Sequence, residues 1–269
     1  MKKPWEEISH NDYEMKRETV DLSDFGKINH LCDHINIEKV YPLSILEGIQ
    51  KGKIYVDNEE APTAALLWHY CGFANILGEY DERFIEEITN MMLNPPEGHS
   101  GRMALQTDND SRLERMILRT PGVVKHERYI FKFAGEKDSI PHLPEVKEIT
   151  TDNYALMKGR IIPTFSWESK EAFLKNGFGY CLIEEGRMLA CAFASGVSKD
   201  YVDIGVETAE ECRGKGYGRI VSAAMVKETL RRGKTPVWDC DIRNEASMRL
   251  ACSVGFEIIG THPWYTHEK

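Results

Sequence analysis

The stretch DIGVETAEECRGKGYG, residues 203–218, carries the strongest structural signal in the chain. Apolar and polar residues alternate over 201–208 as in a strand, and a helix is predicted over 219–231. Between them, three alternating glycines allow a tight turn and let the backbone approach a ligand, because glycine has no Cβ. The first amide groups of the following helix lack intrahelical partners, and the helix dipole adds partial positive charge there. Strand, loop and helix together predict a cradle for a diphosphate.

Other phosphate-binding loops fit these glycines less well. A Walker loop requires Ser or Thr after its lysine, whereas Gly216 follows Lys215. The dinucleotide fingerprint GxGxxG requires a different spacing from that of Gly214, Gly216 and Gly218. We expect Lys215 and Arg219 to add charge at the rim of the cradle.

The composition indicates an acidic globular protein. The 269 residues include 34 Lys+Arg and 43 Asp+Glu, a net charge of −9, and 42% are hydrophobic. This balance argues against a general nucleic-acid binder, which needs clustered Lys and Arg, and favours cationic small molecules. No apolar run reaches the ~18 residues of a membrane span, and no signal-peptide stretch is present. We expect a cytoplasmic protein with neither nucleic-acid nor membrane partners.

Cysteine and histidine spacing predicts no metal site. The seven cysteines are scattered without a CxxC pair, which is typical of reduced thiols rather than a disulfide frame or zinc site. His30 and His34 lie one turn apart in a predicted helix over 25–37, but no third ligand accompanies them in a recognisable motif.

The chain is predicted to divide into two α/β halves. The segment AGEKDSIPHLP, residues 134–144, is the best linker candidate, so we place an N-terminal α/β domain at 1–136 and a second domain at 137–269. Each half closes with a strand, a short helix and a strand, and 103–131 can be aligned with 237–265 with few identities. The other elements predicted for the second half are helices at 152–162, 166–176 and 245–254, a hairpin at 179–184 and 188–195, and strands at 236–242 and 256–260.

Two motifs carry a family resemblance. Arg213–Gly218 resembles the R/Q-x-x-G-x-G/A signature of the GNAT N-acyltransferase superfamily. The second motif, similar to the family's N-x-x-A/S-x-x-L/F-Y-x-x-x-G-F element, comprises Asn244, Ser247, Leu250, Ala251 and Gly255-Phe256. Residues 236–240 and 166–186 look like the subgroup that includes zwittermicin-resistance acetyltransferases. The GNAT resemblance covers 150–260, while 1–140 match only the N-terminal half of that subgroup, and less specifically.

The resemblance implies a GNAT fold of the α/β (α+β) class. Its mixed sheet would splay apart between the strands before and after the loop helix. A degenerate GNAT-like half would precede this domain in the chain. The co-substrate, acetyl-CoA, would lie in that opening, with no metal. The resemblance assigns the pantetheine arm, which would pair like an added strand, to Val206, Glu207 and Thr208. It assigns the diphosphate to Arg213, Gly214, Lys215, Gly216, Tyr217, Gly218 and Arg219, and the end of the arm to Asn244 and Ser247.

The family's chemistry is direct attack of an amine on a thioester, which requires a base, an oxyanion stabiliser and an acid. We select Glu207 as the general base and Asp239 as the next candidate. Asp203 shares a strand face with Glu207, as Asp241 does with Asp239. The alternative is that these acids are solvated strand-end residues or bind a cationic substrate.

The general acid departs from the family pattern, because Ala251 stands where the family has a tyrosine. Tyr217, Tyr265, Cys252 or a water could substitute, and no spacing argument selects among them. Trp238 could form an aromatic wall for a cationic amine, but a core position is favoured.

The leading expectation is an acetyl-CoA-dependent N-acetyltransferase acting on an amine of a small molecule such as an antibiotic or metabolite. The alternatives are a catalytically silent CoA-binding or sensor module, which Ala251 favours, and a protein lysine acetyltransferase. The first half reads GEYDERFIEE at 78–87, without a second glycine loop. We therefore expect that half to build the acceptor pocket or a homodimer contact.

Overall fold

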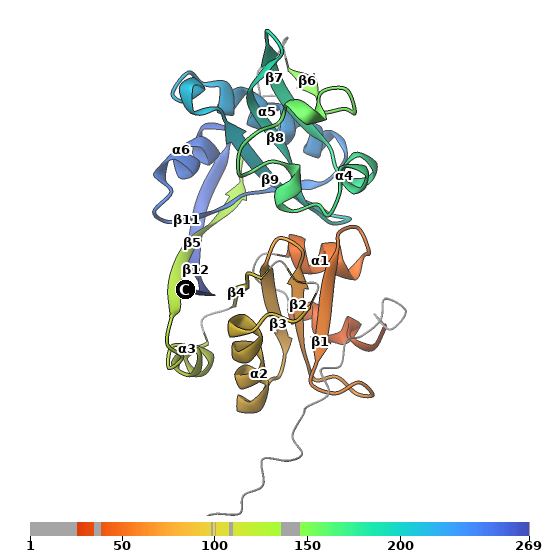
Figure 1. The fold of residues 1–269 in the computed structure, drawn as a ribbon, viewed down its shortest axis with the longest axis vertical. Helices are drawn as coiled ribbons and strands as arrows, with labels where there is room; N and C mark the ends of the chain where they lie inside the picture. Colours follow the sequence, from red (N-terminus) through yellow and green to blue (C-terminus); the bar gives the residue numbers. More distant parts are fainter. Residues whose placement is uncertain are drawn as a thin grey trace, which may run out of the picture.

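The structure is a computed structural model, and it describes residues 26–34, 39–97, 99, 101–107, 110–135 and 146–268. The lower sheet in Figure 1 has the order β1 (Gly52–Val56), β2 (Ala64–His69), β3 (Phe73–Gly78), β4 (Ala104–Gln106), β12 (Phe256–His267), β5 (Val123–Phe133) and β11 (Asp239–Asp241). The upper sheet has the order β10 (Thr235–Val237), β9 (Tyr201–Thr208), β8 (Arg187–Val197), β7 (Gly179–Glu184) and β6 (Lys147–Glu148). The helices are α1 (Val40–Leu46), α2 (Glu82–Leu93), α3 (Ser111–Ile117), α4 (Lys170–Asn176), α5 (Tyr217–Arg231) and α6 (Glu245–Ser253).

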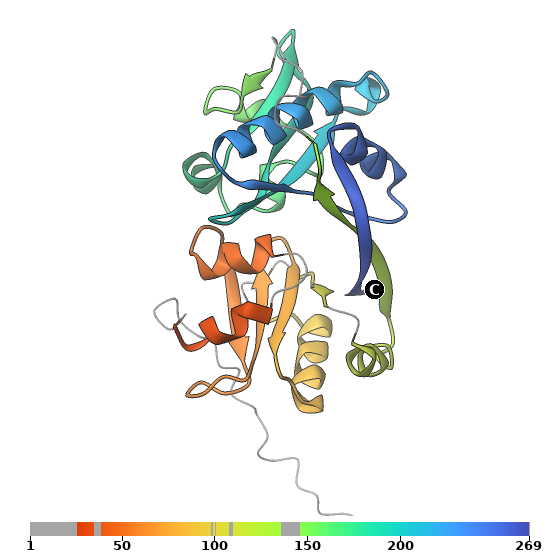
Figure 2. The ribbon, with the colours of Figure 1, turned by 180° about the vertical axis from the view of Figure 1, so that it is seen from behind.

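The two halves exchange strands. β12, from the end of the chain, lies between β4 and β5, and β5 in turn pairs with β11. Figure 2 shows β5 and β12 side by side, running between the upper and lower parts. The unit β4–α3–β5 therefore mirrors β11–α6–β12, in agreement with the aligned segments. The predicted boundary at 136/137 lies outside the described residues and stays a prediction, while the lower sheet takes strands from both sides of it.

The strand predicted at 236–242 is wrong as a single element. β10 pairs in parallel with β9 as far as Val237 opposite Asp203, and β11 pairs with β5 from Asp239 opposite Ile130. Trp238 between them is 3% exposed and belongs to the core, as favoured. Beyond Asp203, β9 continues to Thr208 with β8 on one side, and no described strand pairs with its other edge. This divergence is the predicted splay.

Two further predictions need correction. The helix predicted at 152–162 is absent: a single 3-10 turn at Tyr154–Leu156 stands there, and Gly159, with φ +131°, lies outside helical geometry. The last strand runs to His267 instead of ending at residue 260, because a register shift between Ile258 and Gly260 lets pairing with β5 continue. The predicted strand at 201–208 and the β7–β8 hairpin are confirmed.

The N-terminal half docks on the upper sheet through buried polar contacts. The Gln50 amide donates to the Ser195 carbonyl and accepts from the Val197 N–H, both at 2.9 Å. A Cβ at Gly196 would lie 2.8 Å from Val40 in α1, so the two halves meet here without space for a side chain. This docking places α1 beside β9.

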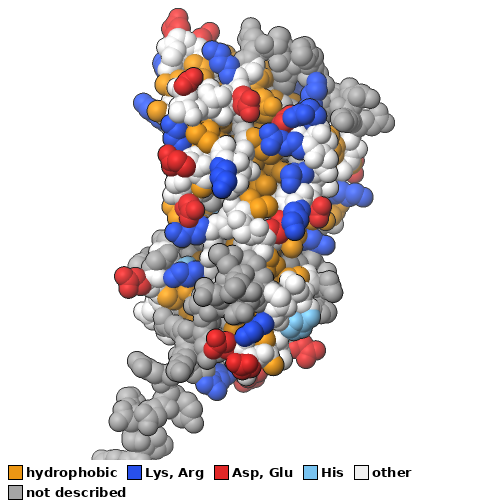
Figure 3. Space-filling view, turned by 90° about the vertical axis from the view of Figure 1, so that its right-hand side faces the viewer, with side chains coloured by type: hydrophobic (Ala, Val, Ile, Leu, Met, Phe, Trp, Pro, Cys, Tyr) orange, Lys and Arg blue, Asp and Glu red, His pale blue; other side chains and the backbone are white. Residues whose placement is uncertain are grey.

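The face of the molecule that carries α4 has hydrophobic side chains beside charged ones. Figure 3, which views the side where α4 lies, shows a band of hydrophobic side chains in the upper part, flanked by charged side chains of both signs. Within the described residues, none of the helices combines the length and hydrophobicity needed to cross a bilayer.

Candidate active site

The start of α5 is open to an anion. Its N-cap, Gly216, has φ +82° and makes no side-chain capping bond, and Gly214 has φ +76°. A Cβ at either glycine would meet no atom within 4 Å, and both glycines are exposed. By contrast, the helices capped by a side chain are α2, α3, α4 and α6, whose caps are Asp81, Asp110, Ser169 and Asn244. The first amide groups of α5 are therefore free for an external acceptor.

The remaining loop residues divide into rim and packing positions. Arg213, Lys215 and Arg219 are exposed, so their charges border the turn. Gly218 packs closely, since its Cβ would lie 3.1 Å from Thr208 Oγ1. Tyr217 is half-buried and packs against the upper core. The absence of a side chain at Gly218 thus lets α5 pack closely against Thr208 of β9.

The equivalent place in the first half already holds an anion. Asp81 accepts the Phe84 N–H at 2.9 Å and caps α2 with its own carboxylate. The Tyr80 hydroxyl donates to Asp110 at 2.7 Å, and the Arg112 guanidinium lies over the Tyr80 ring. A phosphate at this helix start would meet a carboxylate.

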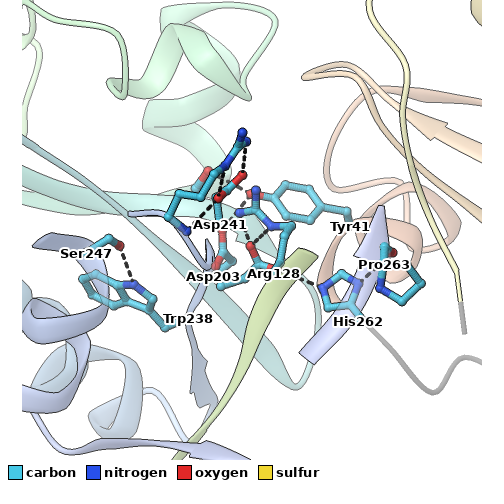
Figure 4. A network of polar contacts seen from close by, with 11 residues as sticks. Tyr41, Arg128, Asp203, Trp238, Asp241, Ser247, His262 and Pro263 are labelled. Atoms are coloured by element: carbon cyan, nitrogen blue, oxygen red, sulfur yellow. Dashed lines mark hydrogen bonds and ion pairs between the residues drawn. The ribbon is translucent and has the colours of Figure 1, made fainter. Parts of the chain in front are cut away.

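The two sides of the splay carry the residues predicted to hold the pantetheine arm. Val206, Glu207 and Thr208 are half-buried on β9. On the far side, Asn244 Oδ1 accepts the Ser247 N–H at 3.1 Å, and Ser247 Oγ accepts Trp238 Nε1–H at 3.0 Å (Figure 4). Asn244 and Ser247 therefore stabilise the start of α6 and fix the Trp238 ring.

Glu207 anchors a loop. Its Oε2 accepts the N–H groups of Arg160 and Ile161, each at 2.9 Å. Its Oε1 lies 3.9 Å from Arg213 Nη2, and the side chain is 15% exposed. The carboxylate can still be reached from solvent, and its role as a base stays a prediction.

Asp239 sits in a buried ionic network. It forms an ion pair with Arg128, and its Oδ2 lies 3.2 Å from His262 Nε2. Burial by itself raises the pKa of Asp239, but Arg128 and His262 outweigh it and hold the pKa well below its ordinary value. A carboxylate held ionised in this way is a weak base, and its contacts tie β11 to β5 and β12.

Asp203 is the acid that shares a strand face with Glu207 and was not selected as a base from the sequence. It is 8% exposed, and its Oδ2 accepts the Tyr41 hydroxyl at 2.7 Å. Burial, with a smaller contribution from the nearby Asp239, raises the pKa of Asp203 to about 7, against the lowering effect of the Tyr41 hydrogen bond. Strand periodicity placed Asp203 on the face of Glu207, but the cover from α1 had no signal in the sequence.

An Asp203→Asn variant should change how stability depends on pH. The folded protein binds this proton more tightly than the unfolded chain, where the pKa is near 3.8. The stabilisation is therefore complete below pH 4 and is lost as pH rises through 7. Between pH 5 and 8 the variant should gain on the wild type by on the order of 2 kcal/mol in urea unfolding. Parallel stability curves for the two proteins would refute the buried, protonated Asp203.

The candidates for the general acid do not converge. The Tyr265 hydroxyl donates to Glu114 Oε2 at 3.0 Å, on α3 in the lower part, and burial raises its pKa above the ordinary range. Cys252 is exposed, and Ala251 is fully buried. Of the candidates Tyr217, Tyr265 and Cys252, none forms a hydrogen bond with Glu207 in the part of the chain that the structure describes. Among those residues there is also no group of three or more His, Cys, Asp or Glu side chains that could hold a metal ion.

Comparison with solved structures identifies the fold. The GCN5-related N-acetyltransferase-like protein of Streptococcus suis 89/1591 matches with a TM-score of 0.71 and 21% identity, over 92% of this chain and 100% of that chain. A tandem GNAT protein from the clavulanic acid biosynthesis pathway matches with a TM-score of 0.54 and 12% identity, over 92% and 97% of the two chains. The fold is thus that of the GCN5-related N-acetyltransferases.

Sequence comparison supplies the family. A family model described as GNAT acetyltransferase matches residues 30–265, and the chain belongs to this family. The uncharacterized N-acetyltransferase YdfB of Bacillus subtilis (strain 168) is 22% identical over 230 residues, 82% of this chain and 88% of that protein. The superfamily predicted from the two motifs is confirmed, and the likeness to zwittermicin-resistance enzymes stays a prediction.

Proposed function

We propose that this acetyltransferase moves the acetyl group of acetyl-CoA to an amine of a small molecule. The observation that carries the proposal is the open start of α5, which follows β9 along the chain, a strand whose residues 204–208 have no described strand beside one edge. β9 and the open start of α5 follow one another along the chain. A nucleotide diphosphate bound at the start of α5 would therefore have its attached pantetheine arm beside β9.

The diphosphate would accept hydrogen bonds from the amides around Gly216, with Lys215 and Arg219 adding charge at the rim. The pantetheine amides would pair with the edge of β9 between residues 204 and 208, where backbone groups face no described strand. The thioester would then point into the opening between β9 and β11.

The acceptor amine would attack the thioester carbonyl carbon, forming a C–N bond as the C–S bond breaks and the thiolate leaves. The amine proton must pass to a base. We assign this task to Glu207, because its side chain is accessible from solvent, whereas Tyr41 covers Asp203. Asp203 is the second choice, since its pKa of about 7 suits proton transfer near neutrality.

Labelled acetyl-CoA with a library of small amines and lysine peptides, analysed by product mass spectrometry, tests this function. We expect acetylated small amines and one CoA bound per chain in calorimetry, because Asp81 occupies the helix start of the first half. Tight CoA binding with no transfer to any amine would favour the silent module that Ala251 suggests. Transfer to peptides alone would favour a protein acetyltransferase.

A further inference from the structure

Three arginines from different parts of the chain meet where the halves join. Arg102 precedes β4, Arg128 lies on β5, and Arg160 lies in the loop that Glu207 holds. The Arg128 and Arg102 Cζ atoms lie 5.2 Å and 5.7 Å from the centre of the same ring, that of Trp264. Asp239 neutralises Arg128. Within the described ranges, no carboxylate pairs with Arg102 or Arg160.

The charge of Arg102 is uncompensated. Burial lowers the pKa of Arg102, and repulsion from Arg128 and Arg160 lowers it further, against an opposing effect from Cys71. The Cys71 thiol supplies no negative charge at neutral pH, because burial raises its pKa to about 12. An anion beside Arg102 would relieve this repulsion.

A pocket of about 290 Å³ lies against Arg102. None of the described residues that line it is acidic, and its size suits part of a small molecule. Its lining residues are Met92, Leu93, Pro95, Gly101, Arg102, Met103 and His267. The Arg102 side chain also lies over the ring of Trp264, whose Nε1 is buried without a hydrogen-bond partner.

We propose that the acceptor amine also carries an oxyanion, a carboxylate or a phosphate, which Arg102 binds. The inference rests on the proposed function. Arg102 and Arg128 both lie over the Trp264 ring, and Arg128 pairs with Asp239 on β11, beside the point where β10 and β11 part. The oxyanion would bind the Arg102 guanidinium while the amine reaches the thioester. This acceptor is amphoteric, unlike a polyamine or a lysine side chain.

Matched acceptors test the proposal: amino acids against their amides, and aminoalkyl phosphates against the corresponding amino alcohols. We expect acetylation of the anionic member of a pair. Arg102→Gln should raise its KM about 10- to 100-fold with little change in kcat. Arg102→Lys should reverse part of the rise in KM, because lysine keeps the positive charge but cannot form the bidentate hydrogen bonds of a guanidinium. Arg115→Gln, an exposed change on α3, is the control and should leave KM unchanged.

Binding provides a readout that does not depend on turnover. With CoA at saturation, which fills the diphosphate site, inorganic phosphate at high concentration should bind the wild type and not Arg102→Gln in calorimetry. Phosphate binding that is absent, or equal in both proteins, contradicts the proposal. Equal use of neutral and anionic acceptors also contradicts it while leaving the acetyltransferase function intact. Failure to bind CoA at all would instead defeat the proposed function.

Discussion

A Gly216→Glu variant should lose at least ~100-fold in CoA affinity while remaining folded. The new carboxylate would lie at the start of α5, where the diphosphate must accept the free amides, and the two anions would repel each other. Gly216 is exposed, and a Cβ there meets no atom within 4 Å, so the side chain itself fits. Calorimetric titration with CoA gives the affinity, and circular dichroism confirms the fold.

Gly233→Glu is the matched control for this variant. Gly233 follows α5, has φ +73°, is exposed, and likewise has no atom within 4 Å of an added Cβ. It reproduces the added charge and the cost of ~1–2 kcal/mol for a left-handed residue, but at the other end of the helix. CoA affinity should be unchanged in the control. Equal losses in both variants, or normal affinity in folded Gly216→Glu, would refute the placement of the diphosphate.

A Glu207→Gln variant should lower kcat by about 10²- to 10⁴-fold. Glutamine keeps an oxygen that can accept the Arg160 and Ile161 N–H groups, so the loop stays anchored while the basicity is removed. The dissociation constant for CoA should stay within about twofold, because the change acts on proton removal and not on the diphosphate. Rapid-mixing or steady-state kinetics with an accepted amine measures the rate.

Glu184→Gln, an exposed acid at the end of β7, controls for loss of charge on the upper sheet and should leave the rate unaltered. An unaltered rate in Glu207→Gln would remove Glu207 from the role of base. Asp203→Asn would then be the variant expected to lose activity. A loss of CoA affinity in Glu207→Gln as large as the loss of rate would instead indicate a role in binding.

The strand–loop–helix unit could be predicted because its signal is local. Alternation over 201–208, three glycines and the helix that follows are all contained in a short stretch, and the structure reproduces them. The division of 236–242 could not be predicted. Apolar and polar residues alternate along a strand in the same way whichever sheet the strand joins. Only the structure shows that the chain passes from one sheet to the other at the buried Trp238, between β10 and β11.

The charged and hydrogen-bonding partners of the site residues come from distant parts of the sequence. Tyr41 and Asp203 are 162 residues apart, and Arg128 and Asp239 are 111 apart, so no spacing argument connects either pair. These contacts arise because the halves dock through α1 and share β5 and β12. The sequence correctly placed these acids on strands. Their protonation depends on neighbouring side chains that come together only in the folded protein.

A crystal structure with acetyl-CoA bound tests the central claim most directly. We expect diphosphate oxygens within hydrogen-bonding distance of the amide nitrogens around Gly216, and a pantetheine arm along the open edge of β9. A diphosphate bound elsewhere, with the turn at 213–219 empty or closed by a protein side chain, would contradict it.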